Sequence, residues 1–305
     1  MFFVGNYSLI NFFRDHGSRF LDMLLNLYIK IILKYIYYKF LKIKKIFYSF
    51  IVYSLAKIIP NKLSFLLENL FFNIQGKGFS SPKNEVKAIS NFLDKNSTKI
   101  ILDVGAYHGF YTDELLAKYP EAQYYLFEPQ QINYSTLIEK FKNKKNIKIF
   151  NCALSDKDEE GIIFSNKFEK TSASLIKRDV SHFKIRFDQE EKIKKKRLDS
   201  IFEKELKYDD DFKVSFCKID IEGFELDFLN SIKDYFNKFE VIQFEFGASN
   251  IDRRYFFKDF WYLLRDSYDI YRITLSGPKI IKKYTEHHEI FLMTNFIAVN
   301  KNILI

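Results

Sequence analysis

A glycine-rich segment between an apolar run and an amphipathic run most constrains what this chain can fold into. The segment covers residues 103–109, the apolar run covers residues 99–102 and the amphipathic run covers residues 110–118. This order is typical of a strand, a tight glycine turn and a helix. The next apolar run ends at Glu128, which puts an acid at the carboxyl end of the adjacent strand, where it can accept hydrogen bonds from both hydroxyls of a ribose. The sequence therefore predicts a site for an adenosine-containing molecule.

Apolar strands alternate with helices after about residue 80. Strands are predicted at residues 100–104, 123–127, 147–151, 213–220, 240–246, 269–274 and 290–299. Helices are predicted at residues 84–94, 110–118, 131–141, 224–235 and 255–267. Continuous apolar strands separated by helices favour an α/β fold with a mainly parallel sheet covered on both faces. The last two strands have no obvious helix between them, so we expect an antiparallel pair there.

Residues 155–198 interrupt this alternation. Residues 161–166 resemble a strand, residues 171–175 are polar, and the charged segment ends in three lysines and Arg197. A long insertion without strong periodicity in a compact domain often carries function. We expect specificity for a substrate to reside there and in residues 275–289.

The N-terminal part of the chain is basic and apolar. Eight lysines and no acid lie between Met23 and Leu67, and most of lysines 30, 34, 39, 42, 44 and 45 fall within half of a helical wheel. We therefore predict a basic amphipathic helical leader at residues 1–75 and a second domain at residues 76–305. The longest uncharged stretch, residues 46–56, has eleven residues, fewer than the roughly 20 of a spanning helix. Three partners for residues 23–67 remain open: an anionic membrane, the second domain with its dimer mate, or, less favoured, nucleic acid.

Composition narrows the setting. The net charge of +9 is largely local to the leader, so no nucleic-acid partner is expected. The chain has two cysteines, Cys152 and Cys217, both in predicted strands; they read as buried small hydrophobes, and a cytoplasmic setting fits best. The first residues do not resemble a secretory signal. A peripheral position on the inner membrane face is compatible with both the cytoplasmic setting and the basic amphipathic leader.

The glycine turn favours a ligand without phosphate. Gly105 and Gly109 let the backbone approach a ligand closely, but their spacing matches neither the dinucleotide nor the ATP-binding glycine pattern. Acids beside the turn suit a cationic ligand such as S-adenosylmethionine, whose sulfonium and amino groups are positive. An ordinary strand-to-helix turn is the alternative.

A second charged group follows the strand predicted at residues 213–220. Period-two geometry predicts that Lys218, Asp220 and Glu222 lie on one side of the strand end. The alternative is a helix cap at Asp220 or Glu222 with a local ion pair to Lys218. A divalent ion between these carboxylates is left open, and no metal is expected at His287 and His288.

Two further residues, an acid and a histidine, are ambiguous. Glu245 ends a strand and either contacts substrate or is a satisfied buried acid. His108 follows the glycine turn, and chance packing at a helix start is favoured over a role in the site.

Several short pieces together resemble one family. They stand in order at residues 102–112, 127–129, 151–156, 172–175, 197–199, 218–223, 244–245 and 295–299. The chain resembles the FkbM family of S-adenosylmethionine-dependent methyltransferases over roughly residues 80–300. The resemblance implies the class I methyltransferase fold, a Rossmann-like sheet of seven mainly parallel strands with helices on both faces. Tyr107 departs from the family, which usually has asparagine there.

The resemblance also implies roles for individual residues. Four would hold the methionine part of the S-adenosyl-L-methionine cofactor: Asp103, Gly105, Ala106 and Gly109. Glu128 would hold the ribose, the region from Asn151 to Ala153 the adenine, and Asp220 would lie near the transferred methyl group. The implied reaction is O-methylation of a sugar hydroxyl in a surface glycan or lipid-linked intermediate, with Asp220 or Glu222 taking the proton and Lys218 fixing the carboxylates or the substrate.

Two other functions remain open at this point. One is a non-catalytic Rossmann-like module that binds a nucleotide or RNA through the leader and residues 194–197. The other is a nicotinamide-dependent oxidoreductase. It is disfavoured because this chain lacks the third glycine of the dinucleotide-binding pattern and a residue that could act as partner in hydride transfer.

Overall fold

The computed structural model describes residues 30, 33–34, 37–51, 54, 61–76, 81–166, 173–175, 177–178, 187–205 and 212–302. Contacts divide the chain into two units, Met1–Glu68 and Asn69–Ile305. The predicted boundary at residues 75–76 stays a prediction, and much of the predicted leader lies outside the described residues. Within the described part of the chain, no helix is both long enough and apolar enough to cross a membrane.

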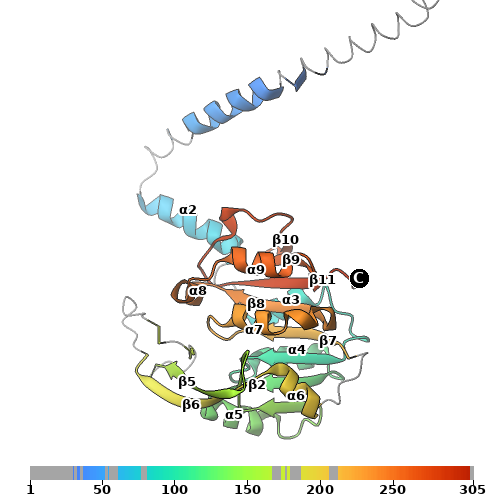
Figure 1. Cartoon of the computed structure of the whole chain (residues 1–305). Coiled ribbons are helices and arrows are strands. Elements are labelled where there is room, and N and C mark those ends of the chain that lie inside the picture. The colour runs from blue at the N-terminus through green and yellow to red at the C-terminus, as the bar shows by residue number, and fades with distance from the viewer. Residues whose placement is uncertain are drawn as a thin grey trace, which may run out of the picture. The chain divides into compact units, whose positions relative to one another are not determined.

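The second unit consists of helices and strands in alternation (Figure 1). The helices, with α2 spanning the division between the units, are α2 (Asn61–Ile74), α3 (Pro82–Ile89), α4 (Phe110–Lys118), α5 (Gln131–Phe141), α6 (Leu198–Glu205), α7 (Glu225–Ser231), η2 (Lys233–Lys238), α8 (Ala248–Arg253), α9 (Phe257–Leu264) and η3 (Glu286–His288). The strands are β1 (Ile100–Val104), β2 (Gln123–Phe127), β3 (Ile147–Phe150), β4 (Ala153–Leu154), β5 (Glu159–Ser165), β6 (Gln189–Lys196), β7 (Val214–Ile219), β8 (Phe239–Phe246), β9 (Tyr268–Thr274), β10 (Gly277–Ile280) and β11 (Thr294–Asn300).

The main sheet has the order β10-β9-β11-β8-β7-β1-β2-β3. Strands β3, β2, β1, β7 and β8 are parallel, and β11 runs antiparallel to both β8 and β9. The predicted α/β fold and the antiparallel closing pair are confirmed. The predicted count of seven is short by one, because β10 adds a hairpin to β9 through a turn that ends at Gly277, whose φ of 100° suits glycine.

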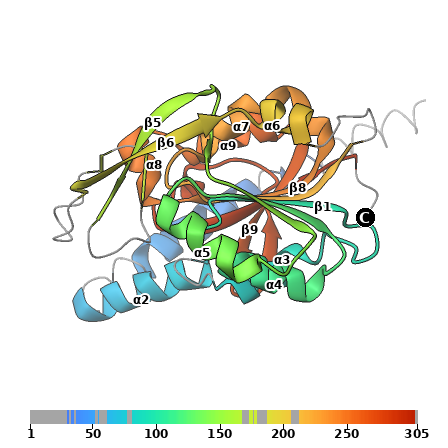
Figure 2. The same cartoon turned by 90° about the horizontal axis from the view of Figure 1, so that it is seen from below.

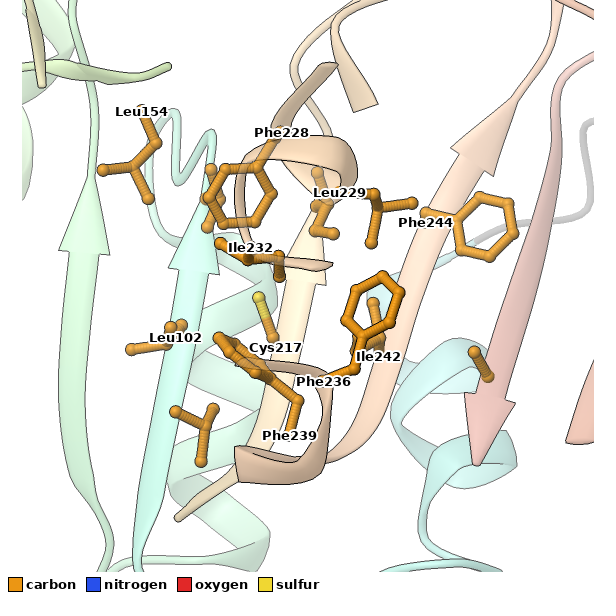
Figure 3. Close-up of a cluster of buried hydrophobic side chains, with 14 of the residues drawn as sticks. Leu102, Leu154, Cys217, Phe228, Leu229, Ile232, Phe236, Phe239, Ile242 and Phe244 are labelled. Carbon is orange, nitrogen blue, oxygen red and sulfur yellow. The ribbon is translucent and has the colours of Figure 1, made fainter. Parts of the chain in front are cut away.

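Helices cover both faces of the sheet (Figure 2). One face buries α3, α4 and α5 side chains against residues such as Ile101, Tyr124 and Val241. The other face is covered by α6, α7 and α9 (Figure 2). Figure 3 shows Phe228, Phe236 and Phe239 packed over Cys217 and its neighbours in the strands. Both cysteines are buried and free, as predicted. The continuous apolar strands are thus explained by burial on two sides.

The insertion forms a separate small sheet with the order β4-β6-β5. The strand predicted at residues 161–166 is confirmed as β5. Residues 189–196, where no strand was predicted, form β6, a strand of mostly charged residues with Ile193 buried against Ala153 and Ile163. One apolar side chain among so many charges is too weak a signal to read as a strand.

Three basic residues at the end of the insertion have acidic partners. Lys195 pairs with Glu159, Lys196 with Asp158, and Arg197 with Asp199. These pairs locally neutralise three of the four basic residues at 194–197 on which, together with the leader, the RNA-binding alternative depended.

Candidate active site

The glycine turn after β1 packs directly against the end of β7. Gly105 has a φ of 86°, and a Cβ atom there would lie 1.9 Å from the carbonyl oxygen of Asp220. Its N–H and that of Ala106 donate to the carbonyl of Phe127 at 3.0 and 3.1 Å. Gly109 begins α4 with a φ of 70°, and a Cβ there would lie 2.6 Å from the Phe141 ring. Only glycine fits at either position, so the turn brings the ends of β1, β2 and β7 together.

Glu128 follows β2 with its carboxylate fixed by the backbone. Oε2 accepts the N–H of Tyr107 and Oε1 accepts the N–H of Gln130, both at 2.9 Å. Burial raises the pKa of Glu128 to about 7. Oε1 also accepts from Asn133 Nδ2 at 3.5 Å, whereas Oε2 keeps a further lone pair, so the carboxylate is oriented and its Oε2 can still accept from a ligand hydroxyl.

Tyr107 contributes through its backbone. Its φ of 47° is in the left-handed region, where asparagine is favoured over bulky residues. Its ring stacks on His108 at a centroid distance of 3.8 Å. His108 Nε2 lies 3.1 Å from Asn133 Oδ1, so this histidine packs at the helix start.

Asp103 lies beneath the glycine turn and is fully buried. Its Oδ2 accepts from the Thr112 hydroxyl at 2.6 Å, whereas Oδ1 is buried without a hydrogen-bond partner among the described residues. Burial raises the pKa of Asp103 above its ordinary value. A buried carboxylate oxygen without a donor is costly unless a ligand supplies one.

Lys218 and Asp220 form an ion pair at the end of β7. Lys218 Nζ lies 2.9 Å from Asp220 Oδ2 and 5.1 Å from the centre of the Tyr111 ring. Burial lowers the pKa of Lys218, but the carboxylates of Asp220, Asp103 and Glu85 outweigh it and leave this pKa above its ordinary value. The lysine is therefore charged.

Glu222 lies beyond the strand, because β7 ends at Ile219. The expectation of simple period-two alternation through Glu222 was therefore wrong, since this residue has a φ of 53°. Its Oε2 pairs with Arg178 Nη1 at 3.2 Å, and burial, followed by the charge of Asp220, raises its pKa to about 8. The helix cap predicted as the alternative at Asp220 or Glu222 was wrong, because Phe224 is the N-cap residue of α7. The local ion pair with Lys218 in the same alternative is confirmed for Asp220.

These groups meet at a cavity of about 260 Å³. Five predicted site residues line it: Gly105, Glu128, Ala153, Asp220 and Glu222. Apolar walls come from both the main sheet and the insertion, namely Phe127, Cys152, Leu154, Ile163, Ala173 and Leu175.

The other five predicted residues support the cavity instead of lining it. Asp103, Ala106 and Lys218 are buried behind it, and Gly109 starts α4. Asn151 Nδ2 donates to the carbonyls of Glu128 and Pro129 at 3.1 and 3.0 Å. This bond fixes the turn that carries Glu128, so Asn151 acts on the site through the backbone.

Other lining residues were not singled out from the sequence. Gln130, Asn133 and Met293 lie close to the recognised motifs but outside them, and no sequence pattern marks them as lining residues. Glu245, left ambiguous by the sequence, lines the cavity, and its pKa is raised well above its ordinary value by burial and then by Asp220 and Glu222.

Two basic side chains pair with these acids, Lys218 with Asp220 and Arg178 with Glu222. Among the residues that the structure describes, no group of three or more histidine, cysteine, aspartate or glutamate side chains is arranged to hold a metal ion. His288 instead contacts the backbone N–H of Thr285 through Nδ1, at 2.9 Å.

Comparisons with known proteins agree with the sequence motifs. The model of the family described as "Methyltransferase FkbM domain" matches residues 103–271. No curated protein matches the chain.

Several solved structures are similar. The fibrillarin/Nop5p complex shares 14% identity, with 72% of this chain and 82% of that chain covered and a TM-score of 0.41. TrmK of M. capricolum, in complex with S-adenosyl-homocysteine, shares 13% identity, with 72% and 68% covered and a TM-score of 0.36. A SAM-dependent O-methyltransferase of Thermotoga maritima shares 10% identity, with 73% and 66% covered and a TM-score of 0.36.

The buried acids make the stability of the ligand-free protein depend on pH. Burial raises the pKa of Glu85, Glu128 and Glu225 from 4.5 to about 7 and that of Glu222 to about 8. An acid with a raised folded pKa stabilises the fold fully below its unfolded pKa, and this contribution is lost as the pH rises through the folded pKa. We expect the free energy of unfolding in urea to fall between about pH 4.5 and pH 8.

Glu245→Gln tests this account by removing one buried carboxyl. The variant should be more stable than the parent near pH 8 and about equally stable near pH 5, where the parent residue is already neutral. The exposed Glu121→Gln is the matched control. A free energy of unfolding that rises over this pH range would contradict the explanation.

Proposed function

Because the chain belongs to the FkbM methyltransferase domain family and uses S-adenosylmethionine as methyl donor, we propose that it methylates a sugar hydroxyl of a surface glycan or lipid-linked glycan intermediate. The observation that carries this proposal is the convergence of Asp220, Glu222 and Glu245 on one cavity beside the glycine turn. A hydroxyl acceptor needs a nearby carboxylate to take its proton. The cavity offers three.

The residues present fit the methyl donor. The backbone turn at Gly105 leaves no room for a Cβ, Asp103 has an unpartnered buried oxygen, and Glu128 presents an oriented carboxylate. These features support the proposed assignment of Asp103, Gly105, Ala106 and Gly109 to the methionine part and of Glu128 to the ribose.

The apolar wall formed by Phe127, Cys152, Ala153 and Leu154 supports placing the adenine there. The donor supplies an electrophilic methyl carbon on a good leaving group. The protein has to attract it, exclude water and align the acceptor.

Proton removal is assigned to Glu222, with Asp220 as its neighbour. Asp220 is held by Lys218, whereas Glu222 has a pKa of about 8, raised mainly by burial. A base with a pKa near the working pH accepts a proton efficiently. With the donor bound, Glu222 would take the proton of the acceptor hydroxyl as the methyl group is transferred to its oxygen. Arg178 then stabilises the carboxylate again when the proton leaves.

The donor site can be tested without knowing the acceptor. S-adenosylhomocysteine at a hundred times its Kd should stabilise the chain by about 2.7 kcal/mol, measured as a thermal shift. Glu128→Ala should abolish the shift, because the ribose loses its acceptor, whereas the exposed Glu121→Ala should keep it. A parent chain that shows no shift but binds RNA with a steep dependence on salt would support the nucleic-acid alternative instead.

Glycan analysis tests the acceptor class. Cells that lack the gene should carry a surface glycan lighter by one methylene unit on one sugar, as read by mass spectrometry. The wild-type gene should restore the mass, and the Glu128→Ala gene should not. An unchanged glycan, together with a normal thermal shift, would refute the sugar acceptor while leaving the methyltransferase intact.

Glu222→Gln tests the base on the acceptor so identified. We expect kcat to fall about 10²- to 10⁴-fold with the S-adenosylhomocysteine shift retained. In the parent, kcat should rise with pH up to about 8, as Glu222 ionises. If Asp220→Asn abolishes activity and Glu222→Gln does not, the proton goes to Asp220.

A further inference from the structure

The helix formed by residues 37–51 carries an apolar face that is exposed to solvent. Phe40, Ile43, Phe47 and Phe50 are spaced three and four residues apart, so they lie along one side of the helix. Their exposed fractions are 61, 64, 64 and 67%. Ile46 and Ile51, also exposed, flank this row. A row of large apolar side chains this exposed indicates a surface that binds something.

The charges of the same helix are all positive. Residues 37–51 contain Lys39, Lys42, Lys44 and Lys45 and no acid. At 3.6 residues per turn, Lys42 and Lys45 fall on the half of the helix away from the row from Phe40 to Phe50, Lys44 lies at the border of that half, and Lys39 lies beside Phe50. Three tyrosines lie among Lys42, Lys44 and Lys45. Tyrosine, with one apolar and one polar end, is favoured where hydrocarbon meets water.

We infer that the helix of residues 37–51 binds in the plane of an anionic lipid bilayer. Its apolar row would enter the boundary between headgroups and acyl chains, and its lysines would lie at the level of the lipid phosphates. The long lysine side chains can reach the phosphates while their stems stay beside the apolar row. The cytoplasmic leaflet, which is anionic, offers the complementary charge. This inference goes beyond the proposed reaction and does not depend on it.

Other partners fit the helix less well. Nucleic acid would pair with the lysines but leave the row from Phe40 to Phe50 in water. A second copy of the helix could cover that row, yet it would bring more lysines close by and no acid from residues 37–51 to pair with them. An anionic bilayer covers the apolar row and pairs with the lysines at the same time.

Vesicle sedimentation of the full chain tests the inference. One set of vesicles contains phosphatidylcholine alone and the other contains phosphatidylglycerol as well. The parent should bind the second set far more tightly. Lys42→Gln with Lys45→Gln should weaken this binding about 25-fold, since each lysine near an anionic surface contributes about fivefold. Phe47→Ser with Phe50→Ser should weaken it by tenfold or more.

Matched variants in the second unit act as controls. Lys144→Gln with Lys145→Gln removes the same charge from exposed sites, and Ile251→Ser with Phe256→Ser removes exposed apolar groups. Neither pair should change vesicle binding. Every variant should keep the S-adenosylhomocysteine shift of its parent, which separates a failure of this inference from a failure of the proposed reaction.

Three outcomes would overturn the inference. One is absence of binding to the anionic vesicles. Another is binding that the Lys42 and Lys45 substitutions leave unchanged. The third is self-association without lipid that Phe47→Ser with Phe50→Ser abolishes, because the apolar row would then be a contact between copies of the chain.

Discussion

The close approach of Gly105 to the Asp220 carbonyl is the contact on which the rest of the site depends. With 1.9 Å between that oxygen and the position of a Cβ, any side chain would push β1 away from β7. The N–H groups of the same turn donate to the carbonyl of Phe127, at the end of β2. Three strand ends are thereby held together, and each carries an acid: Asp103 within β1, Glu128 after β2 and Asp220 after β7. A parallel sheet gathers strand ends at one edge, but the glycine turn sets how close they come.

Gathering acids in this way works against folding stability. Burial and mutual repulsion raise the pKa of Glu222 and Glu245, and only Lys218 and Arg178 are placed among the described residues to offset them. A cationic ligand relieves the same repulsion, so binding and stability are linked through the same carboxylates. The methyl donor is cationic before the reaction and has lost its sulfonium charge afterwards. In the proposed site, the acids would therefore favour the donor over its product by charge, which would help product release.

The sequence predicted the sheet well because buried parallel strands are continuous apolar runs, and β1, β2, α4 and α5 have the predicted bounds. The prediction failed for elements that are too short, too charged or too exposed to show a hydrophobic pattern. Strand β6 is mostly charged, α8 has only six residues, and β10 is a short exposed edge. At the site, motifs located Gly105, Glu128 and Asp220, because glycine turns and strand-end acids are readable. Gln130 and Asn133 stand just after the Glu128 motif in no readable pattern, and the role of Arg178 arises from its ion pairs with Glu222 and Asp252, which are distant in sequence.

Residues of the insertion contact Glu222, which lines the cavity. The left-handed backbone of Glu222 is unusual for a residue with a side chain of this size. Such a conformation costs about 1–2 kcal/mol, and here other parts of the chain hold it. The Ser174 hydroxyl donates to the Glu222 carbonyl at 2.9 Å, and Arg178 bridges the Glu222 carboxylate and Asp252. Because a separate segment holds the strained backbone of the proposed base, acceptor fit and the orientation of that base depend on the same residues. In the proposed reaction, changes at Ala173 or Leu175 in the cavity wall that alter acceptor fit would also act, through Ser174 and Arg178, on the orientation and pKa of Glu222.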